Sequence, residues 1–152
     1  MSKEKSESEP LSEASSSEVQ ALSSLDPMGL QAEVLRLVNI DREKVGLNGL
    51  TMNSTLNNAA MKRAEELQQS FSHARPDGSD CSTVLSQFNI TYFAAGENIA
   101  MNYPSPEAVV DGWMNSPGHK ANILNERFTQ LGVGVSKNDE NTYQWVQIFV
   151  GN

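Results

Sequence analysis

The strongest structural signal in this chain is the segment Val110-Asp111-Gly112-Trp113-Met114-Asn115-Ser116-Pro117-Gly118-His119-Lys120-Ala121-Asn122-Ile123-Leu124. It contains one of the two histidines and one of the two tryptophans, and a Ser-Pro-Gly break separates its two apolar runs. Ser116-Pro117 is typical of a helix start, because serine caps a first turn and proline is tolerated within it. We therefore expect two short helices here, the second of which directs His119 into a site.

The chain before this segment has helical periodicity. Apolar residues spaced three and four apart predict an amphipathic helix over residues 29–45, which Gly46 is expected to end. A second helix is predicted to start at Ser54, whose hydroxyl can cap the first turn. A weaker third helix is predicted around residues 82–88. Ser105-Pro106-Glu107 predicts the start of the next helix, because it combines a cap, a first-turn proline and an acidic residue.

Beyond residue 124 the apolar period changes from helical spacing to alternation. Apolar and small residues alternate in Leu131-Gly132-Val133-Gly134-Val135-Ser136, and alternation returns over residues 143–150. These segments predict an antiparallel hairpin, joined by the turn-forming residues 138–141. A further strand is expected around residues 96–101. Helices first, then a strand, more helix and a hairpin indicate an α+β fold rather than a repeating βαβ pattern.

The first 28 of the 152 residues differ in composition from the rest. Residues 1–28 hold six acidic side chains against two lysines, with many serines and few apolar residues. Such a segment buries too little apolar surface to offset the entropy lost on ordering it. We predict a disordered acidic tether over residues 1–28 and one folded domain over residues 29–152, a size that needs no disulfides.

Charge and hydropathy exclude several classes of protein. The net charge of −8 has the wrong sign for a phosphate-backbone binder, so no nucleic-acid partner is expected. No apolar run approaches the ~18 residues of a membrane-spanning helix. The start Met1-Ser2-Lys3-Glu4 lacks the apolar core of an export signal, which leaves a cytoplasmic start or an exported segment without its signal. The acidic tether favours the exported segment.

Two histidines and one carboxylate stand out as candidate site residues. His73, Glu97 and His119 each lie in a short segment rich in glycine, proline or small residues. Imidazoles and a carboxylate are a ligand set for zinc and similar ions. Each histidine could equally bond backbone carbonyls near a turn, and Glu97 could simply hold an imidazole or an amide in place. The residues alone leave both interpretations open.

Other polar residues have structural interpretations. Asn98 and Asn122 are expected to tie loops together through their side-chain amides. Cys81, the single cysteine, is expected to be a mildly exposed thiol in a polar loop, with a thiol-peptidase nucleophile as the alternative. Arg75 is expected to be exposed, where it would pair with Asp77 or reach towards an anionic ligand.

Four segments in sequence order resemble the bacterial branch of the CAP superfamily. This is the SCP-like domain shared with cysteine-rich secretory proteins, antigen 5 and plant pathogenesis-related 1 proteins. The resemblance covers roughly residues 29–152 and rests on Ser72-His73-Ala74-Arg75-Pro76-Asp77-Gly78, Gly96-Glu97-Asn98-Ile99-Ala100, Trp113 to Leu124 and Leu131-Gly132-Val133-Gly134.

The resemblance implies a fold and a site. The fold is a three-layer α-β-α sandwich with a central antiparallel sheet. The site is a cleft lined by His73, Glu97 and His119, with Ser116 and Asn98 beside them. Animal members often bind a divalent cation there through two histidines and two glutamates. Ser116 occupies the position of the second glutamate, so the candidate metal ligands are His73 and His119, with zinc as the candidate ion.

Two classes of function follow from these expectations. The favoured one is a secreted or surface-tethered binding module, whose cleft holds a small ligand, a cation or part of an extracellular partner. The alternative is a peptidase-like hydrolase, in which His73, Glu97 and His119 act as acid and base or through a metal-activated water. A purely structural domain is disfavoured, because converging polar groups are costly to bury without a use.

Overall fold

The computed structural model describes residues 27–152. The predicted tether lies outside the described residues, except for its last two positions, which open the first described helix. The elements in chain order are α2 (Pro27–Lys44), β1 (Thr51–Met52), α3 (Ser54–Gln69), α4 (Thr83–Gln87), β2 (Ala94–Met101), α5 (Pro106–Met114), α6 (Pro117–Ile123), β3 (Gln130–Lys137) and β4 (Tyr143–Gly151).

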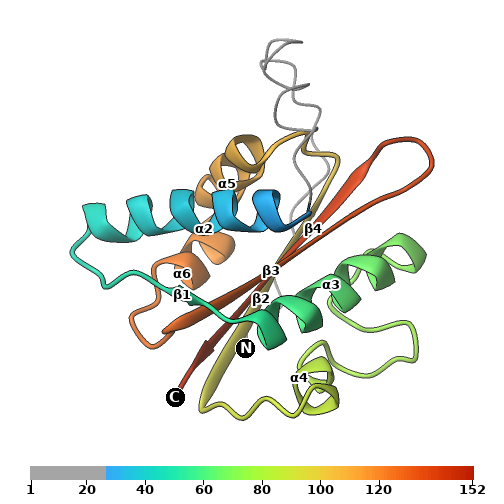
Figure 1. Cartoon of the computed structure of the whole chain (residues 1–152), viewed down its shortest axis with the longest axis horizontal. Coiled ribbons are helices and arrows are strands. Elements are labelled where there is room, and N and C mark those ends of the chain that lie inside the picture. The colour runs from blue at the N-terminus through green and yellow to red at the C-terminus, as the bar shows by residue number, and fades with distance from the viewer. Residues whose placement is uncertain (1–26) are drawn as a thin grey trace.

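The described elements form the three-layer α-β-α sandwich that the resemblance implied. Helices α2, α5 and α6 cover one face of the sheet, and α3 and α4 cover the other (Figure 1). The strand order is β1-β3-β4-β2. β4 pairs antiparallel with both β2 and β3, as predicted for the hairpin. The two-residue β1, which was not predicted, pairs parallel to β3, so the sheet is mixed rather than wholly antiparallel.

Alternation along the strands gives each face of the sheet its own apolar core. The face towards α2, α5 and α6 buries Trp113 and Trp145. The face towards α3 and α4 buries a smaller cluster of aliphatic side chains. On that second face β3 has glycines where α3 crosses it, and a Cβ at Gly134 would overlap the carbonyl oxygen of Ala60. The alternating glycines therefore let helix and strand backbones touch.

The helix ends follow the local signals, with two differences. Gly46 ends the region of α2 with φ +81°, and the Ser105 hydroxyl accepts a hydrogen bond from the Ala108 N–H at 3.1 Å, both as predicted. Ser54 is not the cap of α3. Asn53 is, because its longer side chain accepts from the Leu56 N–H at 3.0 Å. Ser116 precedes α6 as expected, but its hydroxyl does not cap the backbone.

Strand β2 positions the candidate site. It lies at one edge of the sheet and pairs only with β4. Successive side chains of a strand point to opposite faces. Glu97 therefore points to the layer of α3 and α4, whereas Asn98 points to the layer of α6. Within the described part of the chain, no helix has the length and apolar character needed to cross a membrane.

Candidate functional site

The structure brings His73 and Glu97 into direct contact. His73 lies in the connection between α3 and α4, and its Nδ1 is 2.8 Å from Oε1 of Glu97 on β2. Both side chains are buried. A carboxylate can only accept at this contact, so the imidazole donates through Nδ1. In the neutral ring, Nε2 then carries a lone pair, and this buried atom has no hydrogen-bond partner.

A buried arginine that sequence reasoning missed completes this pair. Arg63 on α3 donates from Nε to Oε2 of Glu97 at 2.7 Å and from Nη2 to Oε1 at 3.0 Å. Burial alone would lower the pKa of Arg63, but its hydrogen bonds to Glu97 and Glu66 and its charge interaction with Glu97 raise the pKa overall. Arg63 lies on the helix face that carries Leu56 and Ala60. A cation on an apolar face was therefore the signal that could have revealed it.

A second ion pair extends the network away from β2. Glu66 accepts from Nη1 of Arg63 at 3.0 Å and from Nη2 of Arg75 at 2.7 Å. The prediction that Arg75 is exposed and pairs with Asp77 or an anionic ligand is wrong. The turn that carries Arg75 folds back, through a bridge between Ala74 and Asp80, so that its guanidinium reaches α3. The Asp77 carboxylate accepts from the Ser79 N–H and hydroxyl instead.

Cys81 lies inside the domain and not in an exposed loop as predicted. The residue is only 2% exposed. Its Sγ and one ligand atom each of His73 and Glu97 all lie within 4.8 Å of one another. A cavity of about 10 Å³ adjoins the group and is lined by Cys81, Ser82, Leu85, Ala95, Gly96, Glu97 and Ile148. This volume matches a single water molecule or ion.

The donor set of this group fits a zinc-type ion in part. Imidazole nitrogen and thiolate are preferred zinc ligands. The Glu97 oxygens already accept from Arg63 and His73, so this carboxylate is better placed to orient the imidazole than to bind an ion. His73 and Cys81 are therefore the residues that would hold such an ion, which would supply Lewis acidity.

His119 lies in the opposite layer. It is buried on α6, and its Nδ1 is 2.8 Å from the hydroxyl of Ser116. The candidate ligand group found among residues 27–152 contains His73, Cys81 and Glu97 but not His119. The His119 carbonyl accepts from Nδ2 of Asn98, the residue after Glu97. The two histidines are thus linked through adjacent residues of one edge strand.

Asn98 joins three elements beside Glu97. Its Nδ2 donates to the His119 carbonyl at 3.1 Å and to Oε1 of Gln147 on β4 at 3.0 Å. Its Oδ1 accepts from Nδ2 of Asn122 at 2.9 Å. Asn122 lies within α6 rather than in a loop. The buried amides therefore attach α6 to the edge of the sheet.

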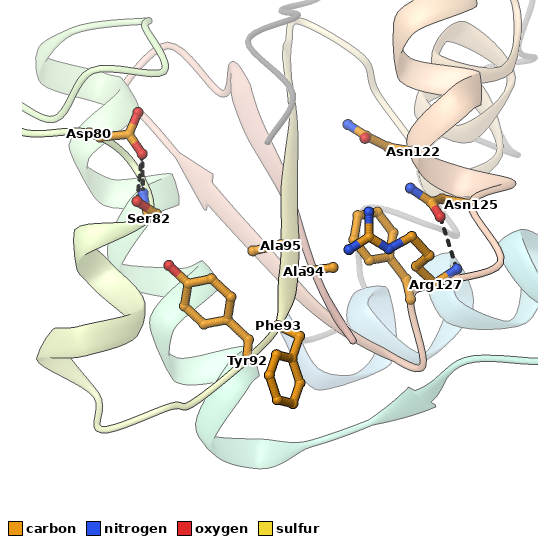
Figure 2. Close-up of a pocket in the computed structure, with 10 residues that line it drawn as sticks. Asp80, Ser82, Tyr92, Phe93, Ala94, Ala95, Asn122, Asn125 and Arg127 are labelled. Atoms are coloured by element: carbon orange, nitrogen blue, oxygen red, sulfur yellow. Dashed lines mark hydrogen bonds between the residues drawn. The ribbon is translucent and has the colours of Figure 1, made fainter. Parts of the chain in front are cut away.

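An open groove of about 510 Å³ lies at the start of β2. Figure 2 shows Asp80, Ser82 and Tyr92 on one side of the strand, and Asn122, Asn125 and Arg127 on the other. Ser82 and Ala95 line both this groove and the small cavity beside Cys81. The site residues predicted from the sequence do not line this groove; these are His73, Glu97, Asn98, Ser116 and His119.

Comparison with known sequences identifies related proteins. The model of the CAP family, described as the cysteine-rich secretory protein family, matches residues 35–150. The protein YkwD of Bacillus subtilis is 38% identical over 123 residues, which are 80% of this chain and 47% of YkwD. The membrane protein YlbC of the same organism is 35% identical over 109 residues, 70% of this chain and 32% of YlbC. The chain thus spans less than half the length of either relative.

Comparison with solved structures supports the same fold. An extracellular protein containing a SCP domain from Bacillus anthracis superposes with a TM-score of 0.77 at 28% identity, covering 95% of this chain and 45% of that one. An outer surface protein from Borrelia burgdorferi gives 0.71 at 22% identity, covering 78% and 90% of the two chains. At that lower identity the likeness extends to the fold alone.

Proposed function

This chain belongs to the cysteine-rich secretory protein (CAP) family, in its bacterial branch, and we propose that it is a binding module of an extracellular or surface-attached protein. The Bacillus anthracis protein, an extracellular protein at 28% identity, supports this location. The site we assign is centred on the imidazole of His73, whereas His119, Ser116 and Asn98 lie across β2 from it, in the layer of α6.

One observation carries this proposal: the buried Nε2 of His73 has no partner. A buried acceptor without a hydrogen bond costs about 1–3 kcal/mol. The Glu97 carboxylate and the Arg63 guanidinium fix the ring in the orientation that leaves Nε2 as the acceptor. A ligand that offers a hydroxyl or amide donor, or a cation such as zinc, recovers that cost on binding.

Zinc is the most direct probe of this site. We expect isothermal titration calorimetry of the full chain with zinc chloride to give micromolar binding. His73→Ala should abolish it, and Cys81→Ser should weaken it by about tenfold or more. His119→Ala is the matched control and should retain binding, since His119 is outside the ligand group. Circular dichroism checks that each variant is folded.

If the titration shows no heat of binding at millimolar zinc, a zinc-type cation is not the ligand of this site. The hydrogen-bonding ligand is then tested with acetamide, a small neutral donor, by following the ¹⁵N resonance of His73 Nε2. We expect a saturable shift of this resonance that disappears in Glu97→Gln, because this variant lacks the carboxylate that holds the imidazole in its orientation. If neither zinc nor acetamide changes this resonance, His73 is not a ligand site.

The second candidate function is hydrolysis. A carboxylate bonded to one ring nitrogen leaves the other free to take a proton, which is the arrangement of an oriented general base. A quenched fluorogenic peptide library, incubated with and without zinc, tests this candidate. Cleavage that is lost in His73→Ala would establish a peptidase. Cleavage unchanged by that substitution, or none, would favour the binding module.

A further inference from the structure

The groove at the start of β2 wraps around an edge of the sheet. Asp80 and Ser82 reach it from the turn before α4, whereas Asn125 and Arg127 reach it from the connection after α6 (Figure 2). These two segments belong to opposite layers of the sandwich. Because β2 is an edge strand, the floor between them is formed by strand backbone at Ala94 and Ala95.

Side chains cap two of the outward-facing carbonyls of β2. The carbonyl of Glu97 accepts from Nδ2 of Asn122 at 3.4 Å, and that of Ile99 accepts from Nε1 of Trp113 at 3.2 Å. In an antiparallel strand with one partner, alternate residues direct both backbone groups away from that partner. Ala95, Glu97 and Ile99 are alternate residues of β2, so their backbone groups point in the same direction. The N–H and C=O of Ala95 therefore point into the groove, and no side chain of the described residues bonds to them.

Two side chains beside this backbone have the features of binding anchors. Phe93 is 87% exposed, although its N–H is fixed by the Gly151 carbonyl at 2.9 Å. The Arg127 N–H is likewise fixed by Oδ1 of Asn125 at 2.9 Å. Within residues 27–152 the Arg127 guanidinium makes no hydrogen bond or ion pair. Aromatic and arginine side chains on a fixed backbone are typical of binding hot spots.

The charges of the groove indicate the polarity of its occupant. Asp80 lies on one wall and Arg127 on the other, with Tyr92 on the same side of the strand as Asp80 (Figure 2). An occupant that crosses the strand edge meets a carboxylate at one end and a guanidinium at the other. A guanidinium binds a carboxylate through two parallel hydrogen bonds.

We propose that this groove binds an extended peptide, which adds to the edge of β2 at Ala95 and places a carboxylate against Arg127. Main-chain hydrogen bonds to Ala95 supply the pairing, Phe93 packs against an apolar side chain, and a basic residue faces Asp80. This is strand addition to an exposed sheet edge. His73 does not line this groove, so the proposal goes beyond the function proposed above and does not depend on it.

Selection from a phage-displayed library of random linear dodecapeptides tests the proposal. The full wild-type chain is the target, and the double variant Phe93→Ser, Arg127→Ala serves for counter-selection. Both side chains are exposed, so the variant should fold. We expect enriched peptides that share an acidic residue. A synthetic copy should bind at least about tenfold more weakly to each single variant.

Two exposed positions outside the groove provide matched controls. Val45→Ser removes an exposed apolar side chain directly after α2, and Lys120→Ala removes an exposed cation from α6. Both should leave peptide affinity unchanged. The variants of His73 described above should also leave it unchanged, which separates failure of this proposal from failure of the proposed function.

The mode of binding is tested by the peptide backbone. We expect the Ala95 amide resonance to shift on titration with the peptide. N-methylation at one peptide position, the one that donates to Ala95, should abolish binding, and methylation of its neighbours should not. Failure of the library to enrich any peptide on the wild type over the double variant would overturn the proposal. So would binding that leaves Ala95 unshifted or tolerates methylation at every position.

Discussion

The guanidinium of Arg63 and the carboxylate of Glu97 form a buried ion pair joined by two hydrogen bonds, of 2.7 and 3.0 Å. The two residues are 34 positions apart and connect α3 to the edge strand β2. His73 bonds to the same carboxylate. Arg63 therefore supports the imidazole orientation on which the proposed function depends through the carboxylate that both residues bond.

Removing Arg63 is expected to destabilise the fold strongly. In Arg63→Met the Glu97 charge stays buried without its cation, which typically costs about 3–5 kcal/mol. The double variant Arg63→Met, Glu97→Gln removes both charges and should recover a large part of that loss. Urea denaturation of the single and double variants, followed by tryptophan fluorescence, measures the two values.

The exposed pair Glu33–Arg36 provides the control for this prediction. Its arginine side chain is 56% exposed and lies 2.6 Å from the glutamate. Exposed ion pairs contribute about 0–1 kcal/mol, so Arg36→Met should change the free energy of unfolding by no more than that. Equal losses in Arg63→Met and Arg36→Met would contradict the assignment of Arg63 as the cation of a buried network.

Glu66 is expected to make the fold sensitive to acid. Burial alone would raise the pKa of this carboxyl, but hydrogen bonds and charge interactions with Arg75 and Arg63 outweigh it and lower the pKa. A carboxyl whose pKa is lowered by folding stabilises the folded state at pH values above the pKa of an ordinary carboxyl. That stability is lost as the pH falls through the pKa of the folded state. The wild type should therefore lose stability more steeply below about pH 4.5 than Glu66→Gln.

Chemical denaturation between pH 7 and pH 3 measures this difference. Glu65→Gln is the matched control, because Glu65 is the exposed neighbour of Glu66 on the same helix. Its stability profile should follow the wild type. If Glu66→Gln also follows the wild type through the acid range, Glu66 does not contribute to acid sensitivity.

Local patterns account for most of the fold. The apolar spacing that predicted the first helix, the Ser105 cap and the alternation from Leu131 onward all depend on residues within a few positions of one another. The strand Thr51–Met52 could not be predicted in this way. It exists through pairing with Gln130 and Leu131, which lie 79 residues further along the chain, and two residues carry no periodicity of their own.

The candidate site was less predictable, because its partners are distant or hidden. The burial of Arg63 depends on Glu97, which lies on another element. Cys81 has polar neighbours and was therefore placed in an exposed loop. Those neighbours bond to each other, since the Ser82 hydroxyl donates to Asp80 at 2.6 Å, while Cys81 itself is only 2% exposed. Sequence polarity does not distinguish such local satisfaction from exposure.

Gly134 is expected to be intolerant of any side chain. A Cβ there would overlap the Ala60 carbonyl oxygen, and neither the Cβ, fixed by its bond to Cα, nor this backbone oxygen can rotate away. Gly134→Ala should therefore destabilise the fold by more than about 2 kcal/mol, the upper part of the range for overpacked sites.

At Gly96 the nearest atoms, at 3.1 Å, belong to the side chains of Asn122 and Phe128, which can shift. Gly96→Ala should cost less than about 1.5 kcal/mol. Thermal denaturation of both variants compares them, and a milder effect at Gly134 would refute direct backbone contact between α3 and β3.

Asn98 is expected to stabilise the junction of α6 with the sheet. Asn98→Ala leaves the His119 carbonyl, the Gln147 side chain and the Asn122 amide without their buried partner. Each buried group left unsatisfied costs about 1–3 kcal/mol, so the total loss should exceed that of Asn122→Ala, which affects fewer partners. Because the two asparagines bond to each other, the double variant should lose less stability than the sum of the single variants. Urea denaturation of the three variants gives the coupling energy. Strict additivity would mean that the Asn98–Asn122 hydrogen bond does not stabilise this junction.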